Sequence, residues 1–260
     1  MQAFSYRNLS TVADAARAAA AGARLIAGGQ SLLPSMKLGL AAPEALADLG
    51  GIAALKGISV ANGVVKIGAM ATHAAVAAHA EVAKAIPALA QLAGNIGDRQ
   101  VRNRGTIGGS LANNDPAACY PAAVLGLGAT VHTNRRDIAA DEFFQGIYTT
   151  ALAEDEVITA VSFPIPEKAG WQKFKQPASR FSLVGVFVSK GPKGVRVAVT
   201  GAGAGGVFRA KALEDKLAAD WSAAALDGAT VSADGLNSDL HGSAEYRAAL
   251  IPVLAQRALG

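Results

Sequence analysis

The chain has 260 residues, of which 51% are hydrophobic, 17% charged and 5% aromatic, and its formal net charge is +4. This length predicts about two domains with a substantial core, and the composition is that of a globular protein. The positive charge is mild and no Lys/Arg run carries interleaved aromatic residues, so we expect no nucleic-acid partner.

Cys119 is the only cysteine in the sequence. An internal disulfide is therefore excluded, and so is an iron–sulfur cluster held by this chain alone. The first residues lack the apolar core of a signal peptide, and no apolar run is long enough to span a membrane. We therefore expect a cytoplasmic protein without a membrane span.

The N-terminal part predicts a helix and a strand that lead into a glycine turn. The helix is expected over residues 10–22, with Ser10 or Thr11 as its cap. Residues 23–27 predict a buried strand that runs directly into the turn of residues 28–31, Gly-Gly-Gln-Ser. One such turn is weak evidence for a ligand site, because purely structural turns have the same composition.

The central part predicts strands over residues 45–49, 64–69 and 157–163, and helices over residues 72–80 and 82–93. Thr72 and His73 stand at the start of the first of these helices, where they either cap the helix or face a ligand. A lone histidine at a helix start is more often structural.

A second glycine turn follows a basic segment. Arg99, Arg102 and Arg104 precede residues 105–110, Gly-Thr-Ile-Gly-Gly-Ser. Successive backbone N–H groups in such a turn form a concave donor site for an anion, and the hydroxyls of Thr106 and Ser110 add donors. A surface turn with a solvated basic flank fits this segment equally well. Two turns of this kind, each with a hydroxyl, indicate a ligand with two phosphates or one pyrophosphate.

A domain boundary is expected at Pro164 and Pro166 and the polar residues 167–170. Beyond it, residues 181–189 and 195–200 predict a hairpin, and residues 209–221 and 243–259 predict helices. Residues 201–206 satisfy the dinucleotide pattern G-x-G-x-x-G in form. The strand before them belongs to a hairpin, whereas a Rossmann first strand is parallel and central, so we interpret them as a glycine-rich connection.

Several segments, read in order, resemble the FAD-binding medium subunit of molybdenum hydroxylases, the relatives of xanthine dehydrogenase and carbon monoxide dehydrogenase. They are residues 27–34, 67–73, 96–112, 173–181 and 243–247, which span nearly the whole chain. The resemblance implies an α+β fold with a two-subdomain FAD-binding module of the vanillyl-alcohol-oxidase (PCMH) type, over residues 1–168. Its subdomains are about 1–55 and 56–168. Residues 169–260 would form a small C-terminal α+β domain of the carbon monoxide dehydrogenase flavoprotein type.

The resemblance also implies which residues contact FAD. The loops of residues 27–32 and 106–110 would grip the pyrophosphate, Ile96 would lie against the cofactor and Ile158 would contact its adenine side. Lys175 would reach the flavin, and Phe181 is either an aromatic near the isoalloxazine face or a core residue. The full expected set is Ala27, Gly28, Gly29, Gln30, Ser31, Leu32, Thr72, Ile96, Thr106, Ile107, Gly108, Gly109, Ser110, Asn113, Asp115, Ile158, Lys175 and Phe181.

One position departs from the family pattern. Relatives commonly have Asp where this chain has Cys119, and that Asp would bond the adenosine ribose. A thiol is a poor substitute acceptor, so Asp115 takes over this contact or the contact is weaker here. We interpret Cys119 as a small packed residue rather than a reactive thiol.

No nucleophile–base pair, metal cluster or paired carboxylates stand out, so we assign no catalytic residue and no metal site. The resemblance implies an electron relay: a molybdopterin subunit hydroxylates the substrate, and a [2Fe–2S] subunit passes electrons to FAD on this chain. The electrons then leave to NAD, a quinone or oxygen, from a heterotrimer or a dimer of heterotrimers. The alternatives are a stand-alone flavin oxidase or reductase, or a nucleotide-binding protein without redox activity. Neither the hydroxylated substrate nor the electron acceptor is indicated by the sequence.

Overall fold

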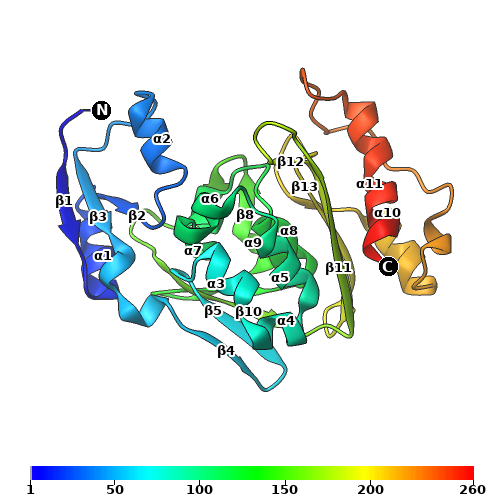
Figure 1. Ribbon diagram of the computed structural model, residues 1–260, viewed down its shortest axis with the longest axis horizontal. Coiled ribbons are helices and arrows are strands. Elements are labelled where there is room, and N and C mark those ends of the chain that lie inside the picture. The colour runs from blue at the N-terminus through cyan, green and yellow to red at the C-terminus, as the bar shows by residue number, and fades with distance from the viewer. Residues whose placement is uncertain (1) are drawn as a thin grey trace.

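The computed structural model describes residues 2–260 and combines mixed sheets with helices packed against them (Figure 1). The N-terminal unit is a small parallel sheet in the order β1-β3-β2, which α1 and α2 flank. Thr11 caps α1 by accepting from the Asp14 N–H, as the sequence predicted for one of two residues. The elements of this unit are β1 Ser5–Asn8, α1 Val12–Ala20, β2 Arg24–Ile26, α2 Leu32–Lys37 and β3 Ala45–Asp48.

The second unit is an antiparallel sheet in the order β4-β5-β10-β6-β7. Asn62 and Gly63 both have positive φ, 51° and 74°, as the tight hairpin between β4 and β5 requires. Its strands are β4 Ile58–Ala61, β5 Val64–Gly68, β6 Thr130–Thr133, β7 Asp137–Ala139 and β10 Ile158–Pro164. A short two-stranded sheet, β8 Phe144–Gly146 and β9 Thr149–Thr150, lies between β7 and β10 in the chain.

The helices between β5 and β6 pack on this sheet and form the largest core. Val65, Ile67 and Val161 of the sheet belong to one buried cluster with Leu89 and Ile107 of the helices. The helices of this unit are α3 His73–Ala78, α4 Ala80–Ala85, α5 Pro87–Gly94, α6 Arg99–Arg104, α7 Ile107–Asn113, α8 Tyr120–Gly126 and α9 Ala140–Phe143.

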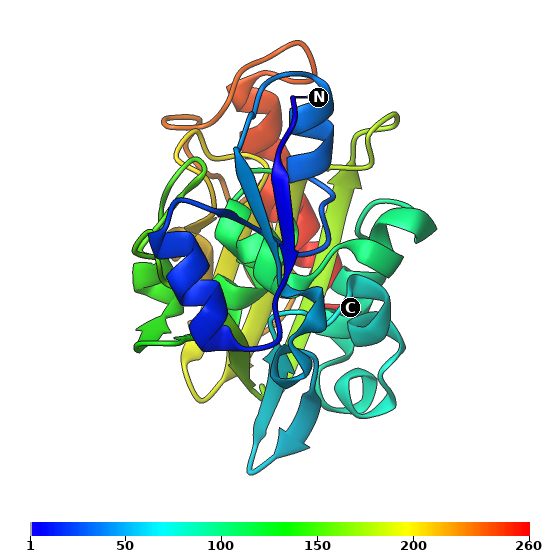
Figure 2. The same cartoon turned by 90° about the vertical axis from the view of Figure 1, so that its left-hand side faces the viewer.

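The third unit is an antiparallel sheet in the order β11-β12-β13-β14, with α10 and α11 packed against it. Figure 1 shows this sheet and the N-terminal unit on opposite sides of α7, and Figure 2 looks at the molecule from the side of the N-terminal unit. The elements are β11 Lys168–Lys175, β12 Ser182–Gly191, β13 Gly194–Thr200, β14 Phe208–Arg209, α10 Lys211–Ala219 and α11 Ala244–Ala258.

Three expectations from the sequence are corrected by the structure. The helix expected over residues 82–93 is two helices, because Pro87 begins a new helix at its first position. The expected glycine turn at residues 105–110 is a helix start, with α7 beginning at Ile107. The expected polar linker at residues 167–170 is largely strand, because β11 begins at Lys168.

The glycine-rich residues 201–206 follow β13, which pairs with antiparallel partners on both sides. The next regular element is the short strand β14, so no helix starts at these glycines. The prediction that these residues form a glycine-rich connection is therefore confirmed. Among residues 2–260 no helix is both long enough and apolar enough to cross a membrane.

Candidate functional site

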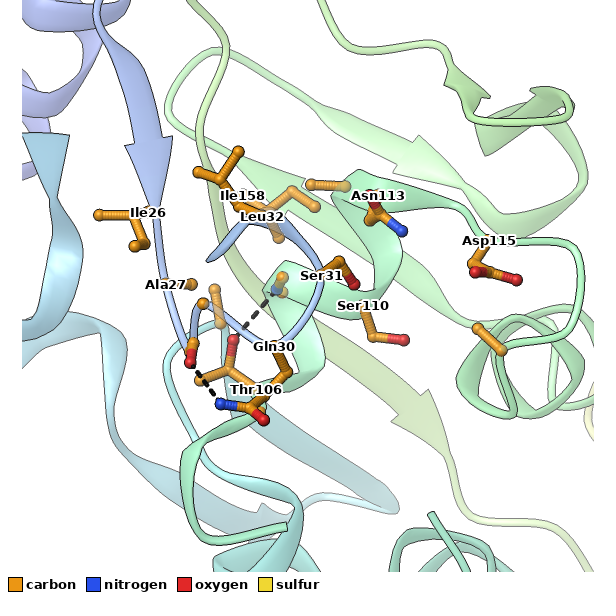
Figure 3. A pocket seen from close by; sticks show the side chains of 18 of the residues that line it. Ile26, Ala27, Gln30, Ser31, Leu32, Thr106, Ser110, Asn113, Asp115 and Ile158 are labelled. Carbon is orange, nitrogen blue, oxygen red and sulfur yellow. Dashed lines mark hydrogen bonds between the residues drawn. The ribbon is translucent and has the colours of Figure 1, made fainter. Parts of the chain in front are cut away.

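A cavity of about 510 Å³ lies where the N-terminal unit, α7 and the third sheet meet. Its volume is in the range of cofactor sites in proteins. The walls come from the loop after β2, the start of α7, the segment before β10, and the strand β11 with the loop that follows it. Figure 3 shows the labelled side chains of Ser31 and Ser110, from two of these segments, pointing into the same space.

The loop after β2 offers unpaired backbone donors. Among residues 2–260, the backbone N–H groups of residues 28–31 have no hydrogen-bond partner. Gly29 has a φ of 71°, which places the loop in the left-handed region that favours glycine. Ser31 precedes α2 but makes no side-chain cap bond, so its hydroxyl is free. This loop therefore has the unused donors that an anionic group needs.

The two loops touch, and glycine makes this contact possible. A Cβ on Gly28 would overlap the carbonyl group of Arg104, and a Cβ on Gly109 would come within 3.3 Å of the Ala27 Cβ. Any larger residue at Gly28 would force the loops apart. The sequence predicted that both loops bind one ligand, and in the structure both loops line the same cavity.

The α7 loop contributes in a different way than the sequence indicated. The Ile107 and Gly108 N–H groups donate to the Ala71 and Ala69 carbonyls, at 3.2 and 2.8 Å. The Gly109 N–H donates to the Thr106 hydroxyl oxygen at 3.1 Å, which caps α7. The expected cradle of successive N–H donors is therefore wrong for this loop, because these donors are already used. Its remaining donors toward the cavity are the Thr106 and Ser110 hydroxyls.

The charged groups of the cavity are unevenly distributed. Glu154, Glu156 and Arg24 belong to the lining. The Arg136 guanidinium donates to Glu156 at 3.0 and 3.1 Å and, with the Thr133 hydroxyl and Ala153 N–H, lowers the pKa of that carboxyl to about 2. Glu156 is therefore a charged, already paired group.

His73 is a buried member of the lining, 5% exposed. Burial, with the nearby Arg102 charge, lowers its pKa to about 4, so the imidazole is neutral at neutral pH. The ring packs on Tyr120 with centroids 5.3 Å apart, and its Nδ1 has no partner. The ring nitrogen that lies next to Gly105, before the α7 loop, is Nε2, whereas the partnerless Nδ1 is the other nitrogen of the ring.

Most of the expected FAD contacts line this one cavity. They are Ala27, Gly28, Gly29, Gln30, Ser31, Leu32, Ile96, Thr106, Gly108, Gly109, Ser110, Asn113, Asp115, Ile158 and Phe181.

Three expected residues do not line it. Thr72 caps α3 by accepting from the Ala75 N–H, and Ile107 is fully buried in the core. Lys175 is exposed and lines a neighbouring basic hollow with Arg102 and Arg180, of which Arg180 also lines the cavity.

The lining also contains residues that the sequence did not indicate. Lys173 lies in the cavity wall, two residues before the lysine that the resemblance favoured. Its ammonium group donates to the Asn95 carbonyl at 3.0 Å and to the Cys119 Sγ at 3.2 Å. Alternation along β11 places Lys173 and Lys175 on one face, but a bulge between Phe174 and Lys175 redirects the latter. The sequence carries no signal for this bulge.

The Cys119 side chain is buried in the cavity wall, as the packed-residue interpretation expected. Its Sγ lies 3.7 Å from the Ser182 hydroxyl at the start of β12. This contact, with that to Lys173, places Cys119 on the side of the third sheet. The Asp115 carboxylate, the suggested substitute, accepts from the Ala117 N–H at 2.8 Å.

A family model described as the FAD binding domain in molybdopterin dehydrogenase matches residues 2–166. This chain belongs to that family. It is 36% identical over 251 residues to the nicotine 6-hydroxylase medium subunit of Paenarthrobacter nicotinovorans, covering 91% of this chain and 88% of that protein. It is 33% identical over 254 residues to the carbon monoxide dehydrogenase medium chain of Hydrogenophaga pseudoflava, with the same coverage of 91% and 88%.

Solved structures show the same architecture. Carbon monoxide dehydrogenase from Hydrogenophaga pseudoflava, in a form without the Mo-pyranopterin moiety, superposes with a TM-score of 0.89 at 34% identity. Quinoline 2-oxidoreductase from Pseudomonas putida 86 superposes with a TM-score of 0.87 at 32% identity. Each match covers 99% of this chain and 96% of the other. The predicted family, the α+β fold and the FAD cofactor are thereby confirmed.

The residues of the cavity fit FAD on their own chemistry. Unpaired N–H groups at residues 28–31 and the hydroxyls of Ser31 and Ser110 offer donors for a pyrophosphate. Apolar side chains such as Leu32 and Ile158 offer surfaces for ring systems.

Proposed function

We propose that this chain is the FAD-carrying electron-transfer subunit of a molybdenum hydroxylase complex. It would receive electrons from a [2Fe–2S] subunit and pass them to an external acceptor. Flavin supplies the chemistry, since it accepts electrons singly and releases them in pairs. The chain's own residues hold the cofactor, exclude water from it and set its electrostatic surroundings. The observation that carries the proposal is the pair of touching glycine loops with unused donors on one cavity wall.

The need for partner chains follows from what this chain lacks. A single cysteine cannot hold an iron–sulfur cluster. The relatives are named as medium subunits or medium chains, which supports a molybdopterin-binding large subunit and a [2Fe–2S] small subunit as partners. We extend this to a dimer of heterotrimers as the whole assembly.

The division of the chain into 1–168 and 169–260 is also a proposal. It is supported by sheet membership, because β1–β10 build the first sheets and β11–β14 build the third. The end of the family match at residue 166 supports the same place. The proposed FAD contacts are the fifteen predicted residues that line the cavity, joined by Lys173 and His73. Thr72, Ile107 and Lys175 do not line the cavity, so we leave them out of the proposed contacts.

The proposal is tested by FAD binding. The full chain, mixed with FAD and freed of excess cofactor, should retain visible flavin absorbance. Gly109→Asp should abolish it, because a carboxylate beside the Ala27 Cβ would stand against the pyrophosphate. Gly57→Asp is the matched control, since nothing lies within 4 Å of a Cβ there. Full flavin in Gly109→Asp would contradict the site.

A second measurement separates the relay from a stand-alone oxidase. The relay predicts that the chain co-purifies with two other chains carrying molybdenum and iron, and that the isolated flavin-loaded chain does not turn over small alcohols or amines. Turnover by the isolated chain would favour the oxidase instead.

A further inference from the structure

The cavity has two ends that differ in charge. The N-terminal end is the part near Glu154 and Glu156, because Val157 beside them packs with Ala15 and Met70 of the cluster under the N-terminal unit. Their charge is offset by Arg136, which is paired with Glu156, and by Arg24 in the same lining. This end therefore has little net charge.

The C-terminal end is the part lined by Lys173, Arg180, Phe181 and Cys119. Among residues 2–260, no ion pair within 4.0 Å includes Lys173 or Arg180. Asp115 is the remaining carboxylate of the lining, and it offsets at most one of these two cations. This end therefore carries an excess of positive charge.

Two hydrogen bonds hold the Lys173 ammonium group in place in the cavity wall. An ammonium group has three N–H donors. Two of them are used by the Asn95 carbonyl and the Cys119 Sγ, at 3.0 and 3.2 Å. Because both partners are neutral acceptors, they orient the ammonium group without cancelling its charge, and one donor remains for the cavity.

We infer that the flavin ring lies at the C-terminal end of the cavity, and that Lys173 stabilises the negative charge that the ring gains on reduction. The inference rests on the proposed function. The reduced flavin ring carries negative charge, so a nearby unpaired positive charge stabilises it. Charged protein groups near the ring are one of the ways in which a protein tunes its reactivity. The neutral adenine suits the N-terminal end, where the Glu154 carboxylate can accept from an exocyclic amino group.

The resemblance implied an adenosine-ribose contact for the Asp that relatives carry at position 119, whereas this arrangement places Cys119 beside the flavin, next to Lys173. A carboxylate at its position would lie next to the Lys173 ammonium and pair with it. The thiol leaves the charge of Lys173 available to the flavin. Cys119→Asp should therefore act like removal of the lysine charge, although it leaves Lys173 in the chain.

Sulfite is the probe for the charge. Its sulfur forms a bond to the flavin N5 with its own electron pair, and the resulting negative charge spreads toward N1 and the C2 carbonyl. A positive group at the ring therefore tightens sulfite binding. In the FAD-loaded full chain, Lys173→Met and Cys119→Asp should each raise the sulfite Kd at least about tenfold, which equals about 30 mV for a two-electron couple. Lys173→Arg should keep the Kd near that of the wild-type chain.

Two control variants replace a lysine and a cysteine without removing the charge of Lys173. Lys175→Met removes a lysine that does not line the cavity, and Cys119→Ser keeps a neutral group; neither should change the sulfite Kd. Flavin content is measured for every variant.

An unchanged sulfite Kd in Lys173→Met or in Cys119→Asp, or no sulfite adduct in the wild-type chain, would overturn the inference. So would a folded Lys173→Met chain without flavin, because the lysine would then hold FAD rather than tune it. If Lys173→Met does not fold, Cys119→Asp decides. Failure of the wild-type chain to bind FAD would instead overturn the proposed function.

Discussion

Two buried ionisable side chains, His73 and Glu156, stand in the cavity wall with opposite charge states. His73 is neutral because burial disfavours its charged form. Glu156 is ionised because Arg136, Thr133 and the Ala153 N–H stabilise its charge. The fold therefore presents one fixed negative charge and one uncharged hydrogen-bonding group to the ligand. Both residues connect the stability of the fold to pH.

Glu156→Gln should lower the free energy of unfolding by about 2 kcal/mol at pH 7, because the charge-assisted bonds to Arg136 are lost. The pKa of Glu156 is about 2 in the folded protein, below its ordinary value of 4.5. Its contribution is therefore present above about pH 4.5 and is lost as the pH falls toward 2. Urea unfolding at pH 7 and pH 3 measures this: the difference between wild type and variant should shrink at pH 3. Glu142→Gln is the control, since Glu142 is exposed; an equal effect of both variants would contradict the assignment.

His73 should make the flavin-free chain less stable as the pH falls from 6.5 to 4. Its folded pKa of about 4 lies below its ordinary 6.5, so the unfolded state alone binds the proton in this window. The wild-type chain should lose up to about 3 kcal/mol over the window relative to His73→Gln. Urea unfolding at several pH values tests this, with the exposed His241→Gln as control. Parallel pH profiles of wild type and His73→Gln would contradict it.

At the residue scale, the sequence located the ligand loops but not the contacts around them. Glycine next to a hydroxyl residue is a local signal, which is why Ser31 and Ser110 could be placed at one site. Lys173 could not be found, because the bulge at Phe174 depends on the pairing of β11 with β12. The sequence also could not show that the Ile107 and Gly108 N–H groups are already hydrogen-bonded, because their acceptors, Ala71 and Ala69, are distant in the chain.

At the scale of elements, close backbone contacts fix how helices meet sheets. Gly170 in β11 lies against the end of α11, where a Cβ would overlap the carbonyl of Ala258. Arg247 of α11 is 3% exposed and donates to the carbonyls of Leu183 and Gly201 at 2.8 and 2.9 Å. The helix is thus anchored to the third sheet near both of its ends. Hydrophobic periodicity predicted α11 and the β12–β13 hairpin, but it could not predict that residues 168–170 belong to a strand, because their composition is that of a linker.

Gly170→Ala should destabilise the chain by about 2 kcal/mol, because the added methyl group must displace the end of α11 from β11. The free energy of unfolding in urea, followed by tryptophan fluorescence, measures the effect; Trp171 is the next residue. Gly205→Ala is the matched control in the same part of the chain, since a Cβ there has no neighbour within 4 Å. If Gly205→Ala is as destabilising as Gly170→Ala, the contact is not the cause.

At the scale of the whole molecule, the largest core crosses the proposed domain boundary. Trp171, Phe187 and Ala198 of the third sheet belong to the same buried cluster as the helices and sheet of the second unit. One close point is Gly126 at the end of α8, where a Cβ would come within 2.9 Å of Phe187. The division into two domains, proposed from sheet membership, therefore does not mean two independent folding units.

The fragment of residues 1–168 should accordingly lack a cooperative unfolding transition. Removing Trp171, Phe187 and Ala198 exposes the apolar surface of α8, whose residues Tyr120, Ala123 and Val124 are fully buried in the whole chain. We expect the fragment to bind a hydrophobic dye and to unfold over a broad range of urea. Adding the fragment of residues 169–260 should restore a sharp transition, which serves as the control for irreversible damage. A sharp transition of the 1–168 fragment alone would instead show that the core divides at the boundary. In that case FAD binding would no longer require the third sheet for stability, and only the C-terminal end of the cavity, with Lys173, would be missing from the fragment.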